Sequence, residues 1–289
     1  MPELPEVEVT RRMLAPRVVG RRIKEVLCGP PSYFFLTPPR RLVQSLRGET
    51  ITSLERQGKY LLMGLAAGQR LLLHLGMTGQ LFIAGTRSPR LVRRVDRYAH
   101  SPSAAAQSDP HTHLALEFED GEPGLRFRDV RKFGKVRLLA AGETDARLDK
   151  LGRDALTADG ELLYTETRRR KVPIKTLLLD QGVLAGVGNI YADEALFLAG
   201  IRPTRSARRV TREQCQLLAT QVKWVLERSI EIGGSSISDF IAPDGQDGQF
   251  QNERRVYART GEACLTCATP IRRVLLGQRS SHYCPSCQK

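Results

Sequence analysis

Four cysteines near the end of the sequence constrain the fold of this chain more than any other feature. Cys264-Leu-Thr-Cys267 and Cys284-Pro-Ser-Cys287 form two C-x2-C pairs, and 16 residues separate the pairs. This spacing is typical of a four-cysteine zinc site, in which each pair forms one tight turn and the two pairs supply four tetrahedral thiolates. Because four thiolates leave no open coordination position, we expect one structural Zn²⁺ that folds the tail and does no chemistry.

Disulfide bonds are the alternative for these cysteines, and the rest of the sequence argues against them. The opening residues, Met1 to Glu6, contain no apolar core of a secretory signal, and no apolar run approaches the roughly 18 residues of a membrane span. We therefore expect a cytoplasmic protein with no membrane partner, a setting in which disulfides are rare. Cys28 and Cys215 are isolated, and we expect both to be small buried residues.

The periodicity of apolar residues changes halfway along the sequence. One short helix is expected from Pro5 until Pro16 and Gly20 end it. Short apolar or alternating runs then indicate antiparallel strands at Leu61–Leu65, Leu71–Leu75, His113–Phe118, Leu125–Val130 and Val136–Leu139. From about Arg153 the pattern is helical, with helices expected at Ile174–Asp180, Ile190–Ala199, Thr211–Glu231 and Ser236–Ile241.

These patterns predict an α+β protein with an N-terminal antiparallel β-sandwich flanked by helices and a helical C-terminal part that ends in a zinc-bound β-hairpin. We place the sandwich domain at residues 1–139, a linker at 140–152, the helical domain at 153–253 and the zinc hairpin at 254–289. The stretch Ala84–Pro110 is rich in Arg, Ser, Pro and Ala without periodicity, which predicts a long exposed loop.

The charge of the chain favours a polyanionic partner. Lys and Arg total 45 against 31 Asp and Glu, a formal net charge of +14. When Lys and Arg neutralise phosphates, counterions are released, and this adds affinity that does not depend on base sequence. The alternative explanation for the positive charge is a basic surface that serves solubility. Arg272, Arg273 and Arg279 lie between the cysteine pairs, which suggests a DNA-contacting hairpin, although similar zinc ribbons also contact proteins.

Six sequence elements occur in the order found in one enzyme family. They are Met1-Pro-Glu-Leu-Pro-Glu-Val-Glu8, Gln57-Gly-Lys-Tyr60, His74-Leu-Gly-Met77, Asp129-Val-Arg-Lys-Phe-Gly134, Gly186-Val-Gly-Asn-Ile-Tyr-Ala192 and the terminal cysteine hairpin. With them the chain resembles the formamidopyrimidine-DNA glycosylases almost from end to end. The resemblance implies a bifunctional glycosylase and AP lyase that excises oxidised purines and cleaves the strand by β,δ-elimination, and a helix-two-turns-helix fold for the helical domain.

The resemblance also implies which residues are catalytic: Pro2, Glu3, Lys59 and Arg279. Removal of Met1 would leave Pro2 with a free secondary amine, and α-amino groups titrate near pH 8, so this amine would be partly neutral and able to form a Schiff base. Glu3 would be the general acid and Lys59 would reach the lesion and its phosphate. The alternatives are a Pro2 that merely opens the chain and a solvated turn lysine at position 59. For Glu6, helix capping and catalysis remain equally open.

A base inside a duplex must be turned out before it can be attacked, and the gap must be filled. The resemblance assigns Met77, Arg131 and Phe133 to this base-flipping wedge. It assigns DNA binding to His111, Arg131, Lys175, Asn189 and Arg279, with a plain helix N-cap as the alternative for Asn189. The segment Asp239–Gln249 would be a lid over the flipped base.

The resemblance makes damaged double-stranded DNA the partner, and we expect a monomer. Two other functions stay open. One is an oxidised-pyrimidine glycosylase of the same fold, from which Leu4 distinguishes this chain because the pyrimidine branch usually has Gly there. The other is a non-catalytic zinc-ribbon protein that senses lesions, against which the intact Pro2-Glu3 pair argues.

Overall fold

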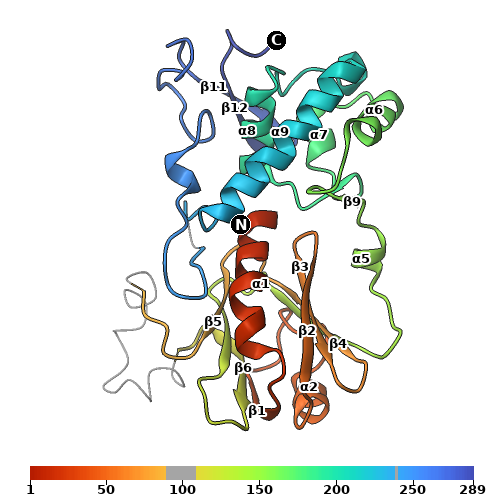
Figure 1. Cartoon of the computed structure of the whole chain (residues 1–289), viewed down its shortest axis with the longest axis vertical. Coiled ribbons are helices and arrows are strands. Elements are labelled where there is room, and N and C mark those ends of the chain that lie inside the picture. The colour runs from red at the N-terminus through yellow and green to blue at the C-terminus, as the bar shows by residue number, and fades with distance from the viewer. Residues whose placement is uncertain (89–108, 238–239) are drawn as a thin grey trace. The chain divides into compact units, whose positions relative to one another are not determined.

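The chain folds as two units, and each unit combines segments that are distant in the sequence (Figure 1). The structure is a computed structural model that describes residues 1–88, 109–237 and 240–289. The first unit contains Met1–Asp145 and Ile232–Gln249, and the second contains Ala146–Glu231 and Phe250–Lys289. Residues 232–249, which the sequence placed in the helical domain, therefore pack with the β-sandwich, and the zinc hairpin packs with the helices.

Two four-stranded antiparallel sheets form the first unit. One sheet has the order β1-β6-β7-β5 and the other the order β2-β3-β4-β8. The strands are β1 (Ile23–Cys28), β2 (Ile51–Gln57), β3 (Tyr60–Leu65), β4 (Arg70–His74), β5 (Gly79–Ile83), β6 (Thr112–Phe118), β7 (Leu125–Asp129) and β8 (Lys135–Leu139). This confirms the predicted sandwich and the five predicted strands.

The apolar faces of the two sheets enclose the core of the first unit. Leu71 and Leu73 of β4, Leu81 of β5, and Leu125 and Phe127 of β7 are all buried in it. Alternate residues of a strand point to opposite faces of its sheet, which is why these side chains share the interior. The strands end at turns, and four candidate site residues of this unit lie on those turns: Lys59, Met77, Arg131 and Phe133.

Two helices accompany the sandwich. Helix α1 (Leu4–Val18) packs against β2, β3 and β5, and it continues two residues beyond Pro16, where a proline costs little because the helix is ending (Figure 1). Helix α2 (Pro39–Leu46) was not predicted. Only Leu42 and Leu46 on it are buried, so its apolar signal is a single pair at i, i+4.

The second unit is mainly helical. Its core forms around α9 (Arg212–Glu231), on which buried residues recur at Cys215, Leu218, Ala219, Val222 and Leu226. The spacing of three or four residues places them on one face of the helix. The other elements are α5 (Ala146–Asp149), β9 (Arg153–Asp154), α6 (Gly160–Arg169), α7 (Ile174–Leu178), β10 (Leu184–Ala185), α8 (Asn189–Leu198), η1 (Ala207–Arg209), η2 (Phe250–Asn252), β11 (Arg272–Leu276) and β12 (Arg279–Tyr283).

The helix predicted at Ser236–Ile241 was wrong at the positions described, 236–237 and 240–241, because Ser236 Oγ donates a hydrogen bond to the Phe240 carbonyl and the backbone bends. Most of the predicted loop Ala84–Pro110 lies outside the described residues. Cys215 is buried as expected, whereas Cys28 is only half-buried, and burial raises the pKa of its thiol to about 11.

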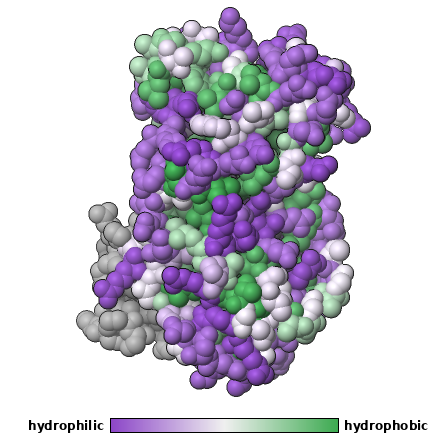
Figure 2. Space-filling view, in the orientation of Figure 1, coloured by the Kyte–Doolittle hydropathy of each residue, from purple (hydrophilic) through white to green (hydrophobic). Residues whose placement is uncertain are grey.

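The surface of the described chain matches its polar composition. The face shown in Figure 2 is largely hydrophilic, with hydrophobic residues in scattered groups. Within the described ranges, no helix is both long and apolar enough to cross a membrane.

Candidate active site and DNA-contacting residues

The start of helix α1 holds the first two candidate catalytic residues. Pro2 and Glu3 are both buried, and Glu3 is the N-cap of the helix. The Glu3 backbone N–H donates a hydrogen bond of 2.8 Å to Oε2 of Glu6, which stands at the third helical position. A glutamate at this position satisfies one of the N–H groups that a helix start leaves without a partner. The backbone that carries Pro2 and Glu3 is therefore fixed.

Glu6 also reaches the distant segment 232–249. Its Oε1 accepts a hydrogen bond of 2.8 Å from the backbone N–H of Ser235, and its side chain is completely buried. Of the two roles left open for Glu6, helix capping and catalysis, the structure shows the capping contact. The hydrogen bond from Ser235 is a further contact that the sequence did not predict. Glu6 thus joins the start of α1 to the segment that contains the predicted lid.

Lys59 lies in the tight turn between β2 and β3. Gly58 has φ of +57°, a conformation that glycine adopts without strain, and Lys59 follows it with 7% of its surface exposed. A solvated turn lysine is therefore excluded. Arg56 connects this turn to α1, because its Nη1 donates to the Gly58 carbonyl at 3.0 Å and its Nε donates to Glu8 Oε2 at 3.0 Å.

Glu8 is the centre of a charge cluster on α1. Its carboxylate accepts hydrogen bonds from Arg11, Arg12 and Arg56 at 2.8 to 3.0 Å. Burial alone would raise the pKa of Glu8, but the three guanidinium groups together lower it to about 2. The cluster was not predicted from the sequence, although Glu8 with Arg11 and Arg12 shows the i, i+3 and i, i+4 spacing of helical ion pairs.

Two of the three predicted wedge residues extend from neighbouring turns. Met77 is 38% exposed in the turn after β4, and Phe133 is 41% exposed in the turn between β7 and β8. The turns touch each other through backbone: a Cβ on Gly76 would lie 2.4 Å from the Gly134 nitrogen, so only glycine fits there. Large apolar side chains exposed at turn tips are not part of the core, so the structure removes the ordinary-core alternative for both.

Asp129 holds the two turns together. Its carboxylate is fully buried and accepts hydrogen bonds from the backbone N–H of Gly134 at 2.7 Å and of Arg131 at 3.2 Å. The Thr78 hydroxyl, from the other turn, donates to the same carboxylate. A buried carboxylate is stable only when such donors surround it. Asp129 therefore fixes Met77 and Phe133 relative to each other.

Arg131 and His111 lie beside this pair of turns. The Arg131 guanidinium lies 4.6 Å above the centroid of the Phe133 ring, a cation–π contact. His111 is half-buried, and its carbonyl accepts a hydrogen bond of 2.8 Å from the Asp129 N–H. Both residues thus lie beside the turn that carries Phe133, and their roles in DNA binding stay predictions.

In the second unit, Asn189 begins helix α8. Gly188 is the N-cap, so the alternative that Asn189 is a plain N-cap is excluded. The turn before it is held by Gln181, whose Nε2 donates to the Val187 carbonyl at 2.9 Å and whose Oε1 accepts from the Gly186 N–H at 3.0 Å. Among the described residues, Oδ1 of Asn189 is buried without a hydrogen-bond partner. The arrangement places an amide side chain at a helix N-terminus, where anions bind.

Lys175 does not have the expected exposure. It was predicted to bind DNA, but its side chain is 0% exposed and its Nζ lies 2.6 Å from Asp193 Oδ1. The same Nζ donates to the Ser280 carbonyl at 2.8 Å. We therefore correct this prediction: Lys175 is paired inside the second unit, and it attaches helix α7 to the zinc hairpin next to Arg279.

Arg279 is exposed at the first position of β12, directly after the hairpin turn. The turn residues Gly277 and Gln278 both have positive φ, +51° and +63°, as in the tight turns that suit twisted hairpins. His282, further along the strand, donates its backbone N–H to Asp193 Oδ2 at 2.8 Å. Contacts to Asp193 and Lys175 thus fix the strand that presents Arg279.

The four cysteines of the tail meet as predicted. Cys264, Cys267, Cys284 and Cys287 have sulfurs within 4.8 Å of one another, and three of the sulfur–sulfur distances are 3.3, 3.4 and 3.9 Å. Zinc–sulfur bonds of about 2.3 Å in a tetrahedron place the sulfurs about 3.8 Å apart. The residues therefore fit one structural zinc ion, with four thiolates and no open position for catalysis.

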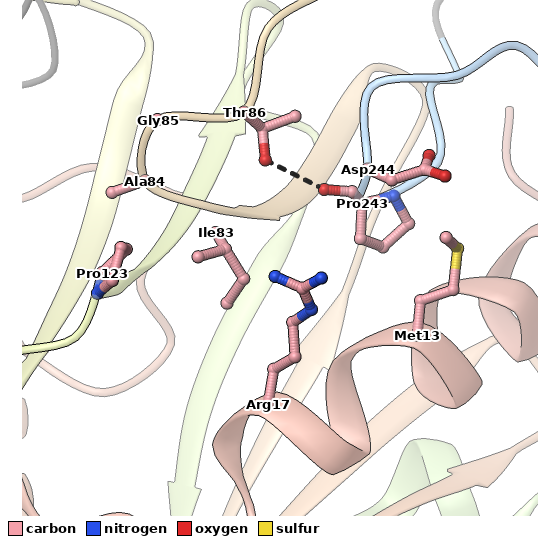
Figure 3. Close-up of a pocket in the computed structure, with 9 residues that line it drawn as sticks. All are labelled: Met13, Arg17, Ile83, Ala84, Gly85, Thr86, Pro123, Pro243 and Asp244. Carbon is pink, nitrogen blue, oxygen red and sulfur yellow. Dashed lines mark hydrogen bonds between the residues drawn. The ribbon is translucent and has the colours of Figure 1, made fainter.

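A pocket of about 450 Å³ lies at the other end of α1 (Figure 3). Arg17 points into it from the helix, and Pro243 and Asp244 form its opposite side, where the Thr86 hydroxyl donates to the Pro243 carbonyl at 3.1 Å. At 1.5 Å per helical residue, Arg17 is about 20 Å from Pro2. The pocket is therefore not part of the candidate active site, but it shows how the predicted lid segment is attached to the loop after β5.

The two four-stranded sheets and the helical unit with its four-cysteine hairpin define a zinc-finger protein of α+β fold. Three family profiles match the chain: the formamidopyrimidine-DNA glycosylase N-terminal domain at residues 1–136, the H2TH domain of the same enzymes at 151–241, and a zinc finger found in FPG and IleRS at 261–289. The chain belongs to the formamidopyrimidine-DNA glycosylase family.

Full-length relatives agree with this assignment. A formamidopyrimidine-DNA glycosylase of Hahella chejuensis is 42% identical over 292 residues, and both chains are covered completely. A solved structure of a Lactococcus lactis Fpg mutant with Fapy-dG-containing DNA is 34% identical, with a TM-score of 0.84 and complete coverage of both chains. A MutM structure with carbocyclic 8-oxo-G-containing DNA is 34% identical, with a TM-score of 0.83 and the same coverage.

Proposed function

We propose that this protein is a DNA glycosylase and AP lyase that excises oxidised purines from duplex DNA with the amine of Pro2 as nucleophile. The observation that carries the proposal is the start of α1, where Glu6 fixes the backbone of Glu3 and thereby the position of the adjacent Pro2. Full-length similarity to glycosylases, two of them solved with Fapy-dG or 8-oxo-G DNA, supports the substrate class.

The reaction starts when removal of Met1 leaves Pro2 with a secondary amine. In its neutral form this nitrogen attacks C1′ of the damaged nucleotide, and the bond from C1′ to the base breaks with its electron pair going to the base. The proton released from the Pro2 nitrogen neutralises the departing base. Glu3 gives a proton to the ring oxygen, the sugar opens, and an iminium joins Pro2 to C1′. The iminium acidifies the C2′ hydrogen, and loss of that proton expels the 3′ phosphate. Loss of the C4′ proton of the conjugated iminium then expels the 5′ phosphate, and hydrolysis restores the amine.

The other candidate residues bind or reshape the DNA in this proposal. Met77, Arg131 and Phe133 fill the space that the extruded nucleotide leaves, Arg131 facing the orphaned base. Lys59 and Arg279 serve the reaction through the phosphates beside the lesion, and Asn189 and His111 hold the backbone without reading sequence. Zinc, when bound, folds the hairpin that presents Arg279. A monomer acting in the cytoplasm is part of the same proposal.

Borohydride trapping on a duplex with one 8-oxoguanine tests the proposal. The protein should form a stable crosslink to the lesion strand and cleave it, because borohydride reduces the iminium. An undamaged duplex is the control, and a thymine glycol duplex tests the oxidised-pyrimidine alternative. Absence of any crosslink would contradict the lyase mechanism, and preferential trapping on thymine glycol would contradict the purine substrate.

A further inference from the structure

We propose that Tyr33 is a positioning residue for base extrusion, because it holds the turn that carries Arg131 and Phe133 from a separate part of the first unit. The inference rests on the proposed function. Tyr33 lies outside the six sequence elements that carry the family resemblance, and its side chain is 57% exposed.

The turn that carries Tyr33 is fixed to the core. The Phe35 N–H donates to the Ser32 carbonyl at 3.0 Å, which closes the turn. Phe34, the next residue after Tyr33, is fully buried with its ring 4.9 Å from that of Phe127 on β7. The Val136 N–H of β8 donates to the Phe34 carbonyl at 3.0 Å. Tyr33 thus projects from a rigid base.

The Tyr33 hydroxyl group contacts the turn that carries Arg131 and Phe133. Tyr33 Oη donates a hydrogen bond of 2.8 Å to the carbonyl of Arg131, while the Arg131 N–H donates to Asp129 on the other side. The next residue, Lys132, has φ of +59°, a conformation that side chains other than glycine rarely adopt. Such a backbone persists only when its surroundings hold it, and Tyr33 holds the peptide that leads into it.

The ring of Tyr33 also extends the exposed surface of the wedge. It lies 6.4 Å from the ring of Phe133, and Lys135 Nζ lies 4.8 Å from the Tyr33 centroid. Exposed aromatic rings with flanking cations suit stacked bases and their phosphates. Because the side chain is largely outside the core, its removal should leave the fold intact. Removal of a tyrosine that served only to stabilise the fold would instead destabilise it.

Two substitutions separate the contributions of the hydroxyl and the ring. Tyr33→Phe removes only the hydrogen bond, and single-turnover excision of 8-oxoguanine from a duplex should fall about 2- to 10-fold. Tyr33→Ala removes the ring as well and should cost about 5- to 50-fold. Leu27→Ala, at an exposed apolar residue of β1, is the matched control and should leave the rate unchanged.

Extrusion itself is measured with 2-aminopurine next to the lesion, whose fluorescence rises when the stack opens. The variants should slow this rise in parallel with excision, and a lesion in a mismatched duplex, which is easier to extrude, should restore most of the rate. Wild-type extrusion and excision by Tyr33→Ala would overturn the inference, as would an equal loss on matched and mismatched duplexes. Failure of the unaltered protein to be trapped would contradict the proposed function and remove the inference with it.

Discussion

The Glu6 carboxylate accepts a hydrogen bond from the backbone N–H of Ser235, 229 positions later in the sequence, at 2.8 Å. Its other oxygen accepts the N–H of Glu3 at 2.8 Å. One buried side chain therefore connects the backbone beside the candidate nucleophile to the segment 232–249. A displacement of that segment would move the Glu6 carboxylate and, through it, the backbone of Glu3. The proposed lid is therefore connected to the candidate catalytic residues through Glu6.

Glu6→Gln should weaken this link. The amide retains one oxygen but replaces the other with an NH₂ group that faces an N–H donor, and a buried unsatisfied donor costs about 1 to 3 kcal/mol. We expect the free energy of unfolding to fall by that amount, and hydrogen exchange in residues 232–249 to accelerate. Urea unfolding and exchange mass spectrometry measure both.

Glu55→Gln is the control for Glu6→Gln, because Glu55 is exposed on β2. If the amides of residues 232–249 exchanged at the same rate in Glu6→Gln as in the unaltered protein, the Glu6–Ser235 hydrogen bond would not stabilise this segment.

The Glu8 cluster predicts a specific acid sensitivity. The pKa of Glu8 is lowered from 4.5 to about 2 in the folded protein, because burial, which raises it, is outweighed by hydrogen bonds from Arg11, Arg12 and Arg56. A carboxylate with a depressed folded pKa stabilises the fold above its unfolded pKa, and this stability disappears as the pH falls through the folded value. Glu8→Gln should therefore be about 1 to 2 kcal/mol less stable at neutral pH, a figure reduced because two arginines reach solvent.

The difference between Glu8→Gln and the unaltered protein should shrink as the pH falls from about 5 to about 2. Thermal unfolding across this range tests it. A difference that stayed constant with pH would show that the substitution acts through packing and not through charge.

Asp129 and Thr78 should behave as one energetic unit, because the Thr78 hydroxyl donates to the buried carboxylate that also accepts two backbone N–H groups of the Phe133 turn. Asp129→Asn and Thr78→Val should each destabilise the protein, and the double variant should lose less than the sum. A coupling of about 0.5 to 3 kcal/mol is expected in a double-mutant cycle of unfolding free energies. Additive losses would mean that the two turns are held independently.

The sequence predicts most of this fold because its strands carry strong local signals. The runs that form β3, β4 and β6 are almost continuously apolar. The spacing of the cysteines in the tail is sufficient to predict the metal site. Strand β2 was missed because only Ile51 and Leu54 are buried on it, a spacing of three that alternation does not detect. Helix α6 was missed for a similar reason, since Leu163 and Thr167 are the only buried side chains beyond its first residue.

The candidate site shows a sharper limit. The exposed turn positions of Met77 and Phe133 can be predicted from the sequence because each residue has a glycine beside it. Lys175 was misjudged because a lysine carries no local signal of its partner, and Asp193 lies 18 positions later on another helix. Tyr33 and the Glu6 contact to Ser235 depend on tertiary packing in the same way, so no single window of sequence contains them.

Removal of zinc should loosen the hairpin and the helices that it contacts. Without the metal, β12 cannot hold its register, and the buried Lys175 and Asp193 lose the Ser280 carbonyl and the His282 N–H. Amide exchange in β11, β12 and α7 should accelerate more than about tenfold on chelation or in Cys264→Ser, with lesion binding lost. The sandwich strands should stay protected. Cys215→Ser, at a buried cysteine outside the zinc site, is the control.

The amine at position 2 provides the most direct test of the chemistry. When Met1 is retained, or a tag is fused before it, Pro2 becomes a tertiary amide whose nitrogen has no available lone pair, so excision and borohydride trapping should both disappear. Duplex binding should persist, because it depends on phosphate contacts elsewhere, and with roughly 5 neutralised phosphates log K should still fall against log salt with a slope of about −4 to −5. In the processed protein, peptide mapping of the reduced crosslink should place it on Pro2. A crosslink on Lys59 would move the nucleophile while retaining a lyase, whereas full excision by a protein whose blocked terminus is verified by mass would overturn the mechanism.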